Sequence, residues 1–166
     1  GTQAGDFTSN NNPGSFNGGV SWTAGKKGRA AAFLGSSSYI DANASGLAWQ
    51  NVFQIGLDFT VSLWVKPTNI GYYTMVGQRY GDAMVFGIGD GTIFPAGRLF
   101  LNMDDGRAAS PYSTASVVAG VWQHVAVTFK GSDASYAATF YINGVAAGTG
   151  TSSDGNGIDL VDLLYI

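Results

Sequence analysis

The sequence lacks several residue types on which whole classes of functional site depend. It contains no cysteine and no glutamate, and His124 is its single histidine. Without cysteine there are no disulfide bonds, no thiolate metal sites and no cysteine nucleophile. Without glutamate, all eleven acidic residues are aspartates. A nucleophilic triad needs a histidine base, so such a triad could only be built on His124.

Charge is also scarce. Charged residues make up 11% of the chain, and the formal net charge is −3. The lysines and arginines are scattered, apart from a short basic cluster at residues 26–29. A nucleic-acid binder usually shows a basic face or stripe, so we expect no nucleic-acid partner. The chain has no apolar run of about 20 residues that could span a bilayer, and we expect no membrane insertion.

The residues that are present favour strands and turns. Hydrophobic residues make up 45% of the chain, and the 25 glycines suit many tight turns. Apolar residues alternate with other residues from Leu57 to Lys66, which indicates a strand with one face toward a core. Residues 122–129 alternate in the same way, with Val125, Val127 and Phe129 on one face and Trp122, His124, Ala126 and Thr128 on the other.

Turn residues divide the rest of the chain into short strands. We predict strands at residues 15–22, 30–34, 38–42, 57–66, 72–78, 83–88, 98–103, 113–118, 122–129, 136–142, 145–149 and 160–166. Residues 30–34 and 38–42 are expected to form a hairpin, and Asn143-Gly144 predicts a second hairpin. No segment shows a helical stripe, so we predict an all-β domain over residues 1–166, built as an antiparallel sandwich of two sheets.

Four segments together resemble the laminin-G-like jelly-roll domains of the concanavalin-A-like lectin/glucanase superfamily. They are residues 25–33 (GKKGRAAAF), 59–67 (FTVSLWVKP), 120–129 (GVWQHVAVTF) and 140–144 (FYING). The resemblance implies a jelly-roll sandwich. It also implies that Leu163–Ile166 corresponds to the penultimate strand of the family, so that either the final strand is missing or this chain closes its sheet in another way. A missing strand would leave an open sheet edge, and this edge could pair with another chain or segment.

Relatives in this superfamily include glucan hydrolases, but we expect no enzyme here. A retaining glycosidase of that type uses two glutamates, one as nucleophile and one as acid, and this chain has none. Asp104 and Asp105 are neighbours, so on a strand their carboxylates would point to opposite faces. The resemblance places His124 in a structural Trp-x-His pattern.

Ligand binding is expected at strand ends, where sandwiches display their loops. The candidate ligand-binding residues are Tyr72, Tyr73, Arg79, Tyr80, Asp82, Asp104, Asp105 and Arg107. Trp64, His124 and Tyr141 alternate away from the core rows and could form an aromatic platform for a sugar. The resemblance favours a framework role for these three, in which loops cover them.

Calcium is the one cofactor that the sequence suggests. The resemblance implies a structural Ca²⁺ near the N-terminal turn, held by Asp6 with carbonyl oxygens near Asn11 and Asn12. The alternative is that the aspartates and glycines of this chain serve only as turn residues.

These observations lead to two functional hypotheses. The first is a non-catalytic carbohydrate-binding or adhesion module of a larger extracellular or surface protein, with a glycan or a surface protein as partner. The second is a structural or protein-interaction domain of a surface or viral assembly.

Overall fold

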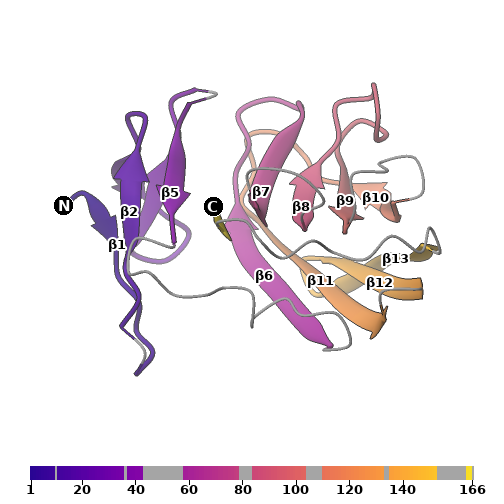
Figure 1. Ribbon diagram of the computed structural model, residues 1–166. Coiled ribbons are helices and arrows are strands. Elements are labelled where there is room, and N and C mark those ends of the chain that lie inside the picture. The colour runs from indigo at the N-terminus through magenta and orange to yellow at the C-terminus, as the bar shows by residue number, and fades with distance from the viewer. Residues whose placement is uncertain are drawn as a thin grey trace.

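The computed structural model describes residues 1–9, 11–35, 37–42, 58–78, 84–103, 110–132, 135–152 and 164–165. In this part of the chain, strands form three antiparallel sheets (Figure 1). The strands of the eight-stranded sheet are, in spatial order, β1 (Gln3–Ala4), β2 (Gly14–Asn17), β5 (Tyr39–Asp41), β14 (Leu164–Tyr165), β7 (Tyr73–Gln78), β8 (Val85–Ile88), β9 (Arg98–Asn102) and β10 (Tyr112–Ser116). Those of the four-stranded sheet are β13 (Val145–Ser152), β12 (Ser135–Ile142), β11 (Gln123–Ser132) and β6 (Phe59–Val65). A separate hairpin pairs β3 (Ser21–Ala24) with β4 (Arg29–Ala32).

The predicted all-β jelly-roll sandwich is confirmed. One core lies between the eight-stranded and four-stranded sheets, and it includes Leu99 and Leu101 of β9 and Val125 and Val127 of β11. The apolar row of β6 packs against this core, as its alternation predicted. Each fully buried Leu or Phe stabilises the fold by about 1.5–3 kcal/mol, so this core supplies the main driving force for folding.

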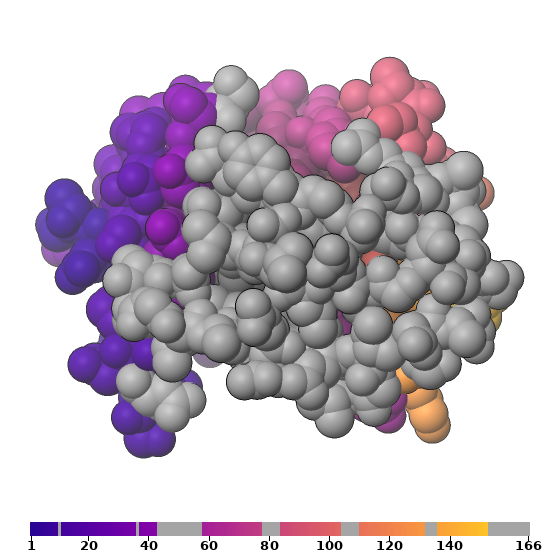
Figure 2. Space-filling view, viewed as in Figure 1, coloured from indigo at the N-terminus to yellow at the C-terminus, as the bar shows by residue number. Residues whose placement is uncertain are grey.

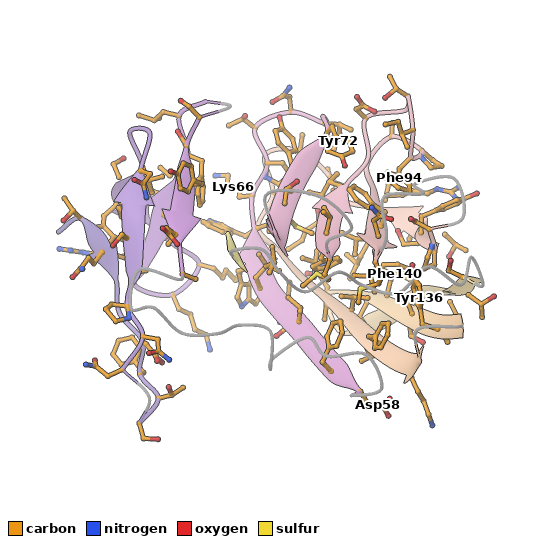
Figure 3. All side chains as sticks on the ribbon, in the orientation of Figure 1. Asp58, Lys66, Tyr72, Phe94, Tyr136 and Phe140 are labelled. Carbon is orange, nitrogen blue, oxygen red and sulfur yellow. The ribbon has the colours of Figure 1, made fainter. Side chains whose placement is uncertain are left out.

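Aromatic side chains bind the two sheets together. Phe59 and Phe129 lie opposite each other on β6 and β11, and their rings stack 4.7 Å apart. Phe129 also contacts Tyr136 of β12 at 5.3 Å. The Tyr136 hydroxyl donates a hydrogen bond to the carbonyl oxygen of Leu101 on β9, in the other sheet. Tyr136 is labelled in Figure 3, close to the fully buried Phe140.

The N-terminal strands differ from the prediction in two respects. The expected strand at residues 15–22 is two strands, β2 and β3, because the chain turns at Gly18 and Gly19, both with positive φ. The expected hairpin between residues 30–34 and 38–42 is also wrong, since β4 pairs with β3, and β5 pairs with β2. Gly18 explains the second difference, because a Cβ there would collide with the carbonyl oxygen of Ser37. Because glycine has no Cβ, β5 can approach β2 at this position.

The C-terminal strand β14 is not an edge strand. Tyr165 is opposite both Asp41 of β5 and Gly77 of β7. Figure 1 accordingly shows the C-terminus between β5 and β7, where it joins the N-terminal strands to the rest of the sheet. The two described residues of this segment are therefore paired on both sides, whereas an open edge left by a missing final strand stays a prediction.

Strand connectivity gives the sandwich two distinct ends. The loops 66–72, 89–97, 117–122 and 143–144 lie at one end, and the Gly120 N–H of one of them donates a hydrogen bond to the Pro67 carbonyl of another. The strand ends Gln78, Val85, Asn102 and Tyr112 lie at the opposite end. In Figure 2, residues of β7 to β9 form the upper right of the visible surface and the N-terminal strands its left side. No helix among the described residues is long and apolar enough to cross a membrane.

Gly87 of β8 provides a test of this packing. A Cβ at Gly87 would lie 2.5 Å from Cζ of Phe100 and 2.5 Å from the backbone oxygen of Tyr73. We expect Gly87→Ala to lower the free energy of unfolding by roughly 1–3 kcal/mol, because the neighbouring backbone cannot move away easily. Urea denaturation measures this change. Gly35→Ala is the matched control, since no atom lies within 4 Å of that Cβ position. Equal stability of the two variants would contradict the packing described.

Candidate functional site

The outer face of the four-stranded sheet carries the most distinctive exposed side chains of the described residues. Its strands are in register, so alternate residues form rows that run across the sheet. One row contains Trp64 of β6 and His124 of β11. The next contains Ser62, Ala126, Tyr141 and Ala146, and the third contains Thr60, Thr128, Thr139 and Thr149. Aromatic groups thus lie toward one end of the face and hydroxyl groups toward the other.

Trp64 is the exposed aromatic residue of this face. Its side chain is 43% exposed, and its ring meets the imidazole of His124 edge-on at 5.5 Å. His124 is held by the adjacent turn: its N–H donates to Oδ1 of Asn143, and its carbonyl accepts from the Asn143 N–H. Asn143 and Gly144 both have positive φ, as a tight hairpin turn requires, which confirms the predicted hairpin. The Trp64–His124 pair therefore rests on a rigid part of the sheet.

Lys26 reaches this pair from a distant part of the sequence. It lies in the turn between β3 and β4, where the Gly25 N–H donates to the Gly28 carbonyl oxygen at 3.0 Å. The Lys26 ammonium is 5.4 Å from the centre of the Trp64 ring, within the range of a cation–π interaction. Trp64 therefore has a cation above its ring and an imidazole at its edge.

The threonine row extends the face beyond the aromatic groups. Each of the four strands contributes one threonine, and the strands are about 4.8 Å apart, so the hydroxyl groups form a regular series. Thr60 and Thr149, at the two edges, are exposed, and Thr128 and Thr139 between them are partly exposed. A hydroxyl both donates and accepts hydrogen bonds, so this row suits a polar ligand.

The structure separates the two tyrosines that the sequence singled out together. Tyr72 is 37% exposed, and its ring stacks on buried Phe100, which in turn stacks on Phe94. Figure 3 labels Tyr72 and Phe94 at the same end of the sheet. Tyr73 instead packs against the core, and its hydroxyl lies 2.7 Å from Oδ1 of Asn69. Tyr72 alone of the two offers an accessible ring.

The other six predicted loop residues lie outside the described residues. They are Arg79, Tyr80, Asp82, Asp104, Asp105 and Arg107. The described strand ends next to them, Val85 and Asn102, face each other across β8 and β9. Tyr72 precedes β7 and so lies at the opposite end of the sheet. The strand order therefore puts Tyr72 at the other end of the sheet from Val85 and Asn102, and each of the eight residues stays a candidate.

The N-terminal turn is organised by Asp6. Its Oδ1 accepts a hydrogen bond from the Thr8 N–H, and its Oδ2 accepts one from the Thr8 hydroxyl and one from the Asn12 N–H, all at 2.8 Å. Asn11, within the turn, has a positive φ of 52°. The described residues contain no group of three or more His, Cys, Asp or Glu placed to hold a metal ion. A calcium ion would need oxygen ligands beyond Asp6, and calcium at Asp6, Asn11 and Asn12 stays a prediction.

A second aromatic feature lies on the β3–β4 hairpin. An open groove is lined by residues 20–24, Gly1 and Arg29. Trp22 within it contacts the ring of Phe16 at 5.0 Å. Its described lining contains one aromatic and one cationic side chain and no carboxylate, so these residues offer no pair of groups for acid–base chemistry.

The family assignment follows from residues that span most of the sandwich. A laminin-G-type family model, described as the concanavalin A-like lectin/glucanases superfamily, matches residues 34–166. The chain belongs to this superfamily. No curated protein matches the sequence. The matched region contains both sheets from β5 onward and therefore the whole outer face with Trp64 and His124.

One solved structure shows the same superfamily fold. It is that of "a putative carbohydrate binding protein" from Bacteroides ovatus, with a TM-score of 0.51 and 20% sequence identity. The alignment covers 99% of this chain and 36% of that chain. The present chain therefore spans about a third of the length of that neighbour, and at this identity the likeness shows the fold alone.

Two features of the site lie before the residues that the superfamily model matches. Lys26 and Asp6 both precede residue 34. Sequence reasoning missed the Lys26–Trp64 contact because 38 positions separate the two residues, and the basic cluster at residues 26–29 looked like a solvated turn. The preference for covered framework aromatics was also wrong for Trp64, which is 43% exposed. Its position opposite the core row of β6 was the signal that could have identified it.

The hydrogen bonds to Asp6 predict a pH dependence of the N-terminal turn. The N–H groups of Asn12 and Thr8 and the Thr8 hydroxyl stabilise the carboxylate and lower the pKa of Asp6. Because the folded pKa is depressed, this stabilisation is present at neutral pH and is lost as the pH falls through the folded value. We expect the Asp6 carboxyl to titrate below the ordinary aspartate range in an NMR titration. Hydrogen exchange at the Asn12 amide should be faster in Asp6→Asn. Unchanged exchange would contradict the role of Asp6.

Proposed function

We propose that this protein is a non-catalytic carbohydrate-binding module, and that a sugar binds on the outer face of the four-stranded sheet. The observation that carries the proposal is the exposed ring of Trp64 beside rows of hydroxyl groups on one rigid sheet. The sequence hypothesis placed the ligand at loops instead. The outer face is preferred because its groups are adjacent in the described structure.

The chemistry of this face matches that of a sugar. A pyranose ring has a face of C–H groups that packs on an aromatic ring, and hydroxyl groups around its rim that form hydrogen bonds. Trp64 offers the apolar surface, and an indole is the largest aromatic side chain available for such a contact. On the same face of β6, Ser62 lies two residues before Trp64 and Thr60 lies two residues before Ser62, and both are exposed. A sugar stacked on Trp64 therefore has hydroxyl partners along the same strand.

The relationships of the chain support this function. The superfamily is named for lectins as well as glucanases, and the Bacteroides ovatus neighbour is named for carbohydrate binding. The neighbour supports the proposal only through its fold and its name. A location outside the cell or on a surface fits a glycan-binding module and stays a prediction, as does its place in a larger protein.

The proposal excludes hydrolysis of the bound sugar, because a glycosidase requires a pair of carboxyl groups at the bond that it cleaves. Glycosidases place two carboxyl groups about 5–10 Å apart, across the bond that is cleaved. The chain has no glutamate, and Asp58 is the one described carboxylate beside β6. Figure 3 shows Asp58 and Lys66 at opposite ends of β6. Asp58 precedes Trp64 by six residues, about 20 Å along a strand, so it does not reach a sugar stacked on Trp64.

A second candidate function, protein interaction, is favoured by a different observation. Several exposed aliphatic side chains lie in or next to the loops 66–72, 89–97, 117–122 and 143–144, at one end of the sandwich. They are Ile70, Ile93, Val118, Val121 and Val145. Exposed apolar groups gathered in one region are typical of interaction surfaces. This function would leave sugar binding at Trp64 unnecessary, so the absence of any glycan binding by the wild-type protein would favour it.

Trp64→Ala tests the carbohydrate proposal. Loss of the stacking surface should weaken binding of oligosaccharides found on a glycan array by roughly tenfold, equivalent to about 1.4 kcal/mol. Isothermal titration with the best array ligand measures the change.

Tyr112→Ala is the matched control for this variant. Tyr112 is 44% exposed, close to the value for Trp64, but it belongs to β10 of the other sheet. Its removal should leave sugar affinity unchanged. If the wild-type protein binds no glycan on the array, or if the two variants lose affinity equally, the proposed site is wrong.

The absence of catalysis has its own test. Incubation of the wild-type protein with each bound oligosaccharide should release no new reducing ends, because the chain has no glutamate and Asp58, the described carboxylate beside β6, does not reach a sugar stacked on Trp64. Asp58→Asn gives the comparison, since it removes the one described carboxylate beside β6. Release of reducing ends by the wild type that disappears in Asp58→Asn would show that the protein is an enzyme.

A further inference from the structure

We propose that the Trp64 surface prefers sugars that carry a carboxylate, that is, uronic acid residues, and that Lys26 provides this preference. The inference rests on the proposed function, because it concerns the ligand class of the same site. It goes further in assigning specificity to the β3–β4 hairpin, which lies before the region that the family model matches.

The first argument is the distribution of charge. The chain carries a net charge of −3, yet the groups around Trp64 are cationic or able to become so. Lys26 lies over its ring, His124 lies at its edge, and Lys66 follows it by two residues on the same face of β6. Asp58 lies at the other end of the strand (Figure 3). No carboxylate among the described residues forms an ion pair with Lys26. As far as the described residues go, an anionic ligand would therefore meet positive charge without a carboxylate partner.

The second argument is the way in which Lys26 contacts the ring. The ammonium is 5.4 Å from the ring centre, and Lys26 is exposed. An exposed cation–π contact is weak, so a sugar can displace the flexible lysine side chain from the face of the indole. The displaced ammonium then stays beside the ring, because its backbone is fixed by the hairpin. A neutral sugar would displace Lys26 without giving it a new partner.

The third argument concerns the position of the carboxylate in a uronic acid. The carboxylate is attached at the rim of the pyranose ring, so it stays at the periphery when the ring stacks on the indole. The displaced Lys26 ammonium and the imidazole of His124 are the groups at that periphery. A carboxylate thus replaces the cation–π contact with an ion pair, which compensates for the displacement of Lys26.

The experiment compares three oligosaccharides with the same linkage and length. They are a β-1,4-linked glucose trimer, the corresponding glucuronic acid trimer, and the glucose trimer sulfated at O6. Binding of each is measured by isothermal titration at 50 mM and 500 mM NaCl. The proteins are the wild type, Lys26→Gln, Lys27→Gln and Trp64→Ala. Lys27 is the matched control because it is an exposed lysine of the same turn with no contact to Trp64 among the described residues.

We expect the wild type to bind the glucuronic acid trimer roughly two- to fivefold more tightly than the glucose trimer at low salt. High salt should reduce this preference, because it screens charges at the surface. Lys26→Gln should lose the preference, because the glucose trimer no longer has to displace a lysine and the glucuronic acid trimer no longer gains an ion pair, whereas Lys27→Gln should retain it. Trp64→Ala should weaken binding of all three trimers.

Other outcomes distinguish the inference from the proposed function. If the wild type binds the glucose and glucuronic acid trimers equally, or if Lys26→Gln keeps the preference, the inference is wrong and carbohydrate binding stands. Tighter binding of the sulfated trimer than of the glucuronic acid trimer would overturn the assignment to uronic acids. If Trp64→Ala binds all trimers as the wild type does, the proposed function itself fails at this site.

Discussion

The packing of the four-stranded sheet against the eight-stranded sheet is the interaction on which the rest of this structure depends. Phe129, Tyr136 and Phe140 extend from one sheet toward Leu99 and Leu101 of the other, and the Tyr136 hydroxyl bonds to a backbone carbonyl across the interface. Side chains alternate along a strand, so burial of these residues also determines which residues face outward. A shift of one residue in any strand would move its apolar row into water.

The outer face is a direct consequence of this constraint. With Val61, Leu63 and Val65 of β6 packed against the core, Thr60, Ser62 and Trp64 must face away from it. The same alternation on β11 turns His124 and Thr128 outward, and the pairing of β6 with β11 sets Trp64 opposite His124. The site therefore needs no special backbone geometry. Its precision comes from the rigidity of the core beneath it.

The hairpin of β3 and β4 adds a positive charge beside Trp64. The face itself carries aromatic and hydroxyl groups, and the cation over the Trp64 ring comes from Lys26, outside that sheet. Gly28, with positive φ, closes the turn that holds Lys26 in place. A common scaffold for binding sugars can thus gain a preference among sugars from a short segment that packs on it. The exposed aliphatic side chains Ile70, Val118 and Val121 lie in loops at the same end of the sandwich, and they differ chemically from this polar and aromatic face.

The sequence by itself determined the fold class, most strand positions and the core face of β6 and β11, because a two-residue alternation is a local signal. It also excluded functions that require a cysteine or a glutamate side chain. Strand pairing was harder to predict: the turn at residues 35–37 looked like a hairpin, but the close approach of Gly18 to Ser37 directs β5 to β2. Tyr72 and Tyr73 looked equivalent, and only their opposite orientations separated them. The contact of Lys26 with Trp64 was decided by the tertiary structure alone, because it depends on how a hairpin packs against a strand far along the chain.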